Sequence, residues 1–184
     1  MVLAEGAAVV TVESEADARE RGARIYARIL GVASVNEGVH LRKVDESGEA
    51  VARVMETAVR RAELIPSDID YICAHGNSMQ DYDAAETAGI KRVFGSHAWN
   101  MPVSSTKSMC GQALAASSAM QVVVCCLALK HQIVPPTINY QTADPRCDLD
   151  YVPNIARPAR VRTALIHAHS LGGAHVAMIL GAPN

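Results

Sequence analysis

The sequence lacks an excess of charge of either sign. Its 184 residues include 17 lysines and arginines and 19 aspartates and glutamates, which gives a formal net charge of −2. The two signs are interspersed, so no basic stripe indicates nucleic acid or an anionic membrane as a partner. About half of the residues, 49%, are hydrophobic, which at this length is enough for the core of one domain but not of two.

The sequence also lacks CxxC spacing and a secretory signal. Its 5 cysteines form an odd set: Cys73, Cys110, Cys125, Cys126 and Cys147. Free thiols in a reducing compartment fit this pattern best. The chain begins directly with the strand-like segment MVLAEGAAVVTVE, residues 1–13. We therefore expect a cytoplasmic protein.

Charge is absent from one long stretch, residues 108–129. This stretch contains Gln112, Ser117, Ser118 and Gln121 and is rich in small residues. Such polar content favours a helix buried on all sides within a protein over one that crosses a membrane.

Hydrophobic periodicity and turn residues predict strands that alternate with helices. The expected strands cover residues 7–13, 23–35, 69–74, a site near 103, 162–170 and 174–180, and the expected helices cover 14–22, 49–64, 81–94 and 109–131. The last two strands flank Gly172 and Gly173 and predict a hairpin. We find no internal repeat or low-complexity linker, and the alternation predicts an α/β layered fold.

A His–Gly pair follows the apolar run at 69–74. His75 and Gly76 thus lie where a strand ends, and ligands of open α/β sheets bind at that edge. Asp83 and Glu86 share a face of the next helix, which could reach back toward a cation or a backbone amide. The alternatives remain a histidine satisfied by local backbone and a solvated acidic pair.

Lys107 precedes the uncharged stretch. If its ammonium points inward it is desolvated and needs a partner, for which Glu86 is a plausible candidate. The lysine is then either a structural ion pair or part of a site. Cys110 lies in the following turn, where a thiolate would be favoured, but no adjacent histidine supports a catalytic role.

Three histidines, His167, His169 and His175, lie near the C-terminus. The first two are spaced to share a face of a strand, and Cys73 could join them as a metal ligand. Without a strong ligand signature, we expect histidines packed beside a cavity and no metal.

Three segments together resemble the C-terminal half of a β-ketoacyl-acyl carrier protein synthase, a condensing enzyme of the thiolase-like superfamily. They are YICAHGNSMQDYDAAETAGIKRVFG, PVSSTKSMCGQALAASSAMQVVVCCLALKHQIVPPTINYQTADPRCDLDYVP and the closing GGAH. Residues 1–31 are similar to the end of that family's N-terminal half. The resemblance implies a thiolase-like layered fold, with residues 1–34 ending the N-terminal half and 35–184 forming the C-terminal domain: a mixed sheet covered by helices, one of them long and buried.

The resemblance also implies a reaction and a site. The reaction is a decarboxylative Claisen condensation of fatty acid or polyketide synthesis, with substrates on the phosphopantetheine of acyl carrier protein and no further cofactor. The matching positions are His75 as the first active-site histidine, Lys107 as its electrostatic support, Asp83 and Glu86 as the anchoring acidic pair, and the Leu171 amide, before Gly172 and Gly173, as an oxyanion donor.

Several positions depart from the family's pattern. Gln112 replaces the second histidine; it cannot shuttle a proton, but its amide can donate a hydrogen bond. Leu171 replaces the gating phenylalanine, Ser170 the preceding glycine and His175 the asparagine after the turn. Asn77 and Met79 replace threonines.

The family's nucleophilic cysteine is missing, because none of the cysteines lies on a tight strand-to-helix turn. One hypothesis is therefore a synthase half, either a natural subunit or a fragment of a longer product, completed by a separate N-terminal half. The other is a non-catalytic partner of a full ketosynthase subunit, similar to a chain-length factor. An unrelated α/β binding domain is a third. Because half of a layered fold exposes apolar faces, we expect a homo- or hetero-oligomer.

Overall fold

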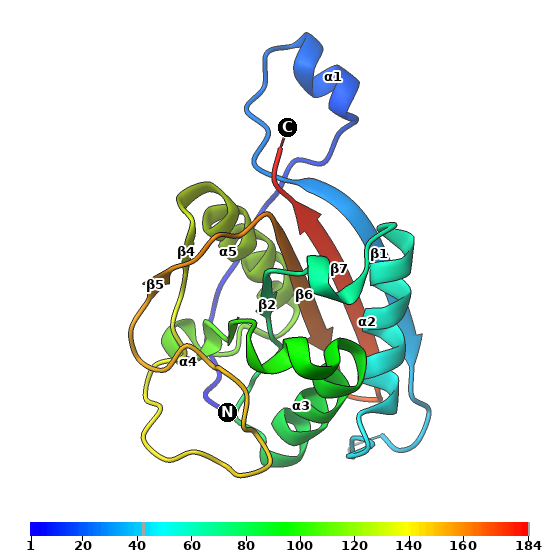
Figure 1. Ribbon diagram of the computed structural model, residues 1–184, viewed down its shortest axis with the longest axis vertical. Coiled ribbons are helices and arrows are strands. Elements are labelled where there is room, and N and C mark those ends of the chain that lie inside the picture. Colours follow the sequence, from blue (N-terminus) through cyan, green and yellow to red (C-terminus); the bar gives the residue numbers. More distant parts are fainter. Residues whose placement is uncertain (42, 184) are drawn as a thin grey trace.

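The computed structural model describes residues 1–41 and 43–183 and is built around a mixed β-sheet (Figure 1). The order of its 5 strands is β1-β7-β6-β2-β3. Their bounds are β1 Arg28–Asn36, β2 Tyr71–Cys73, β3 Val103–Ser104, β6 Thr163–His169 and β7 Ala174–Gly181. β7 runs antiparallel to both β1 and β6, whereas β2 is parallel to β6 and β3. The mixed sheet confirms the predicted fold class.

Helices cover both faces of this sheet. Helices α2 (Glu49–Arg61) and α3 (Gln80–Phe94) pack on one face, and α5 (Ser117–His131) packs on the other. Alternation along the strands supplies both cores: Ile72 and Leu165 join the cluster under α2 and α3, while Ile166 joins the cluster under α5. Buried on both faces, β2 and residues 164–166 of β6 form short continuous apolar runs.

The short elements complete the chain. They are α1 Glu15–Glu20, α4 Lys107–Cys110, the strands β4 Ile133–Val134 and β5 Arg157–Pro158, and the 3-10 turns η1 Pro66–Asp68, η2 Gly95–Trp99 and η3 Leu114–Ala116. The predicted C-terminal hairpin is confirmed, and α1 is capped by Ser14, whose Oγ accepts a hydrogen bond from the Asp17 amide at 3.1 Å. The predicted strand at 7–13 is wrong: these residues are irregular and pair with no strand, and Val9 is 93% exposed.

The long helix predicted at 109–131 is also wrong, because two shorter helices replace it. Gly111 has φ of 72° and Leu114 has φ of 48°, both outside the right-handed helical region. Between them the Gln112 amide donates to the Val2 carbonyl at 2.8 Å, and the Gln112 carbonyl accepts from the Ala4 amide at 3.0 Å. Pairing with the N-terminal segment thus interrupts the helix.

α5 is not buried on all sides, contrary to our expectation. Gln121, Cys125 and Ala128 face the sheet, whereas Val123 and Leu127 are 37% and 43% exposed. By length and composition alone, Leu114–His131 could cross a membrane, with 28% of it buried in the chain, but core helices of larger folds meet the same criterion. The exposed face borders an apolar groove of about 820 Å³ whose other wall is formed by residues from 9 to 29.

Candidate active site

The loop that follows β2 is held by a buried carboxylate. Glu86 of α3, 5% exposed, accepts hydrogen bonds from the amide of His75 at 2.7 Å and from the amide of Gly76 at 2.9 Å. The same carboxylate accepts a hydrogen bond from His167 Nδ1 at 2.6 Å. Burial by itself would raise the pKa of Glu86, but His167 and these amides lower it to about 2. The ionised carboxylate therefore fixes the backbone of the loop.

Asp83 holds the next residue of the same loop, Asn77. Its Oδ1 accepts a hydrogen bond from the Asn77 amide at 3.2 Å. Burial, followed by repulsion from Glu86, raises the pKa of Asp83 to about 7. The acidic pair on α3 thus reaches back to backbone amides, one of the two arrangements that the sequence suggested.

The His75 ring is held in one tautomer. Its Nδ1 accepts a hydrogen bond from the His169 amide at 3.1 Å, so in the neutral ring the proton lies on Nε2. Burial lowers the pKa of His75 to about 3, with opposition from Glu86 and support from Lys107. At neutral pH His75 is therefore an uncharged donor through Nε2.

Lys107 does not pair with Glu86 as we expected. Its Nζ donates to the His75 carbonyl at 2.6 Å, and within residues 1–41 and 43–183 no ion pair joins Lys107 to Glu86. The reason is that Glu86 already accepts from two amides and from His167. Burial lowers the pKa of Lys107, while Cys73 and the acidic pair oppose that shift.

A cavity of about 670 Å³ lies beside this network. Its wall includes Asp83, Glu86, Lys107 and Gln112. Gln112 Oε1 accepts from Ser117 Oγ at 3.1 Å, and in the described chain its side-chain NH₂ has no partner. The amide nitrogen is therefore free to donate to a molecule in the cavity.

The His75 side chain is not part of the wall of this cavity. Of its neighbours, Ala74 and Gly76 line the cavity, whereas the His75 ring centroid is 5.8 Å from that of His169. The structure thus gathers Lys107, Gln112 and the acidic pair at one wall, and connects His75 to them through backbone.

The turn between β6 and β7 carries the predicted oxyanion donor. Gly172 and Gly173 have φ of 85° and 82°, which only glycine adopts at low cost. Leu171 is 72% exposed, and no acceptor in the described residues takes its amide hydrogen. The His169 amide joins this turn to His75, but the oxyanion role of Leu171 stays a prediction.

The sequence did not assign two buried residues of this region to the site. Gln121 of α5 donates through Nε2 to the carbonyls of Ala74 and His167 at 2.9 and 3.1 Å, which ties α5 to the loop and to β6. Glu37, just after β1, lies beside His175. A lone polar residue in an apolar helix and a glutamate after a strand are common, so only the tertiary structure assigns them to the site.

A mixed sheet with helices on both faces, a histidine after a buried strand, and a lysine that contacts its carbonyl define the C-terminal half of a thiolase-like condensing enzyme. The family model of the beta-ketoacyl synthase C-terminal domain matches residues 26–141, and the chain belongs to this family. The boundary that we place after residue 34 falls within β1 and stays a prediction.

Three relatives illustrate the similarity. The tetracenomycin polyketide synthase ketoacyl synthase alpha subunit of Streptomyces glaucescens is 41% identical over 182 residues, which is 99% of this chain and 43% of that protein. A type II polyketide ketosynthase, solved with its acyl carrier protein and a bound hexaketide, is 43% identical with a TM-score of 0.91 over 94% of this chain and 42% of that one. The ishigamide ketosynthase/chain length factor is 35% identical with a TM-score of 0.89, over 94% and 42%. The chain therefore spans less than half the length of these relatives.

Proposed function

We propose that this chain supplies the C-terminal part of a β-ketoacyl-acyl carrier protein synthase and acts with an N-terminal half that carries the nucleophilic cysteine. The observation that carries the proposal is the arrangement of Lys107 on the His75 carbonyl, with both loop amides held by Glu86. Such a fixed loop presents a neutral imidazole without reorganisation, as electrostatic stabilisation of developing charge requires.

The proposed reaction breaks and forms carbon–carbon bonds. The malonyl group on acyl carrier protein loses carbon dioxide, and the electron pair of the broken bond forms an enolate. That enolate attacks the acyl thioester carbon, a carbon–carbon bond forms, and the cysteine thiolate leaves. His75 Nε2–H is the donor for the enolate oxygen, Lys107 adds positive potential, and the Leu171 amide serves the acyl oxyanion.

Gln112 takes the place of a second imidazole in this proposal. Its free NH₂ at the cavity wall can donate to a substrate oxygen in that cavity, and Ser117 Oγ orients the amide by donating to its Oε1. Because a donor is needed there but proton transfer is not, an amide can serve. We expect Gln112→Ala to lower the rate about 100-fold, the usual cost of one lost oxyanion donor.

On this proposal the thiol comes from outside the described residues of this chain. Cys73 of β2 and Cys125 of α5 are fully buried where the helix packs on the sheet, so they are not accessible to a carrier protein. Cys110 is exposed, but its helix α4 has only 4 residues and offers no neighbouring base. The apolar groove along α5 supports the same conclusion, because a second half would cover it.

Native mass spectrometry of the C-terminally tagged chain, recovered from its own host, tests the proposal. We expect a partner of similar size with one cysteine that becomes acylated by acyl carrier protein. Condensation should then require Lys107 and Gln112, measured with Lys107→Ala and Gln112→Ala and with Ser96→Ala as the exposed control. Recovery without any acylated cysteine would contradict it.

A non-catalytic partner is the second candidate. It is favoured by Gln112, by the exposed Leu171 in place of a gate, and by His175 after the turn. On this proposal the chain pairs with a complete ketosynthase, by analogy with the ishigamide ketosynthase/chain length factor. A full-length synthase partner whose activity is unchanged by Lys107→Ala would support it.

A further inference from the structure

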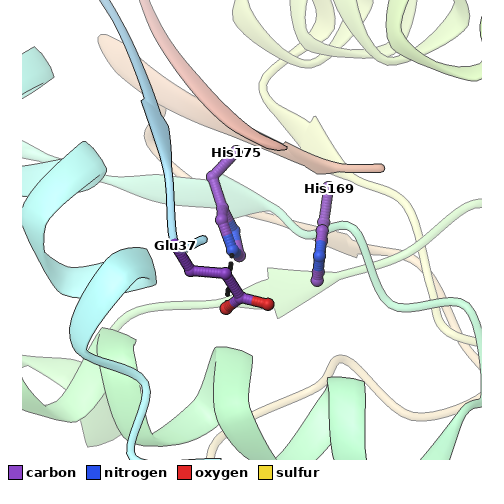
Figure 2. Close-up of side chains that lie close together, drawn as sticks. All are labelled: Glu37, His169 and His175. Carbon is purple, nitrogen blue, oxygen red and sulfur yellow. Dashed lines mark hydrogen bonds and ion pairs between the residues drawn. The ribbon is translucent and has the colours of Figure 1, made fainter. Parts of the chain in front are cut away.

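Three strand ends bring Glu37, His169 and His175 together beneath the β6–β7 turn (Figure 2). Glu37 follows β1, His169 ends β6 and His175 lies near the start of β7. One ligand atom from each residue lies within 4.8 Å of the others. The Glu37 and His175 side chains are 2% and 0% exposed.

One buried oxygen in this cluster lacks a hydrogen-bond donor in the described chain. Glu37 Oε2 accepts from the Asp45 amide at 3.2 Å and lies 3.4 Å from His175 Nε2. Glu37 Oε1 is buried and has no hydrogen-bond partner in the described chain. A buried carboxylate oxygen without a donor is costly, and a cation would compensate it.

The hydrogen bonds of His175 prepare its other nitrogen for a metal. Glu86 accepts a hydrogen bond from His167 Nδ1, and His167 Nε2 lies 3.2 Å from His175 Nδ1. In the tautomer in which His175 Nδ1–H donates to His167, the lone pair of His175 Nε2 faces Glu37. Metal-bound histidines have this arrangement, in which the second ring nitrogen donates to another group.

Packing holds the other two ligands. The His169 ring stacks on Tyr82, with centroids 4.7 Å apart, and on His175, with centroids 4.0 Å apart. A Cβ at Gly173 would collide with the Glu37 side chain, so the glycine turn lets the carboxylate fold beneath it. Burial lowers the pKa of both His169 and His175 to about 4, so both rings are neutral at pH 7.

We propose that Glu37, His169 and His175 bind one divalent first-row transition-metal ion, with Zn²⁺ the best fit. Two imidazoles and one carboxylate are a common donor set for such ions, and a fourth position stays open to water. Bonds of about 2.0–2.2 Å place ligand atoms roughly 3.3 Å apart in a tetrahedron, so the cluster contracts when the ion binds. The site departs from the absence of metal that we expected from sequence.

Titration of the chain, together with any partner it requires, with Zn²⁺ and with Co²⁺ tests the site. We expect one saturable equivalent by calorimetry and the visible bands of four-coordinate Co²⁺. Glu37→Gln keeps the shape of the side chain but removes its charge, and should weaken binding by at least about 10-fold. His131→Gln, an exposed histidine at the end of α5, is the control and should bind as wild type.

Anomalous scattering at the zinc edge from soaked crystals locates the ion. Density between Glu37 and His175 is expected. Weak binding at several sites, unchanged in a Glu37→Gln variant with normal circular dichroism, would overturn the proposal. So would an ion held only by surface histidines. None of these readouts depends on condensation, so they are independent of the proposed activity.

Discussion

The loop after β2 and the outer face of α5 differ in how far this chain provides their contacts. The polar groups of the loop have partners, whereas the apolar face of the helix is only partly covered. Around His75, the loop amides, the carboxylates and the ammonium have partners within the chain. Along α5, Val123 and Leu127 face an apolar groove that the N-terminal segment only partly covers. The hydrogen bonds of the loop are therefore complete within one chain, whereas the outer face of α5 is left exposed.

The largest effect on stability is expected in the loop after β2, whose backbone amides have partners within the chain. Glu86→Ala leaves two buried amides and His167 without their acceptor, so we expect the free energy of unfolding to fall by about 3–5 kcal/mol in urea denaturation. Glu49→Ala is the control, because Glu49 pairs with Arg92 at the surface and should cost about 1 kcal/mol or less. Equal losses in the two variants would show that the network is not what stabilises the loop.

A charge on α5 should separate assembly from folding. Leu127→Asp places a carboxylate in the apolar groove, so we expect the affinity for the partner surface to fall about 100-fold or more, since charges are excluded from interface cores. Ser96→Asp, exposed in η2 on a different element, is the matched control. Analytical ultracentrifugation measures the effect, and a monodisperse wild-type monomer would refute the predicted association.

The raised pKa of Asp83 should make the free energy of unfolding depend on pH. Its pKa of about 7 in the folded chain exceeds the ordinary value of 3.8, so the folded state binds the proton more tightly. Stability from this group is present below pH 4 and is lost as pH rises toward 7. Asp83→Asn should remove this loss and gain about 1–2 kcal/mol at pH 8 relative to pH 4.

The exposed Asp81→Asn is the control for that series. It lies two residues away on the same helix, at the surface beside Arg146, and should not reproduce the gain of Asp83→Asn at pH 8. If Asp83→Asn gave the same pH dependence as wild type, the raised pKa would be wrong.

The smallest effect is expected in the N-terminal segment. Arg21 pairs with Glu13 at the surface, and solvent screens such pairs. We expect Arg21→Ala to leave the thermal midpoint of the chain unchanged within error. A marked shift would mean that this segment is packed more tightly than its exposure indicates.

Most elements could be predicted from periodicity, because α2, α3 and the β6–β7 hairpin have their own apolar pattern. The errors share one cause. The strand at 7–13 and the unbroken helix at 109–131 were inferred from local pattern, whereas the structure pairs residues 2–4 with Gln112 across the sequence. The expected ion pair of Lys107 with Glu86 was wrong for a similar reason, since the sequence does not show how many donors one carboxylate already serves.

The sequence by itself determined the family, through motifs at 71–95 and 102–153, and the alternation of strands and helices, because both are local properties of the chain. Only the tertiary structure decided which partners those residues have. In the tertiary structure Lys107 Nζ donates to the His75 carbonyl, and His167 lies between Glu86 and His175. Glu37, just after β1, lies beside His175 of β7. Contacts between residues of different strands and helices depend on sheet order and register, which no short segment encodes.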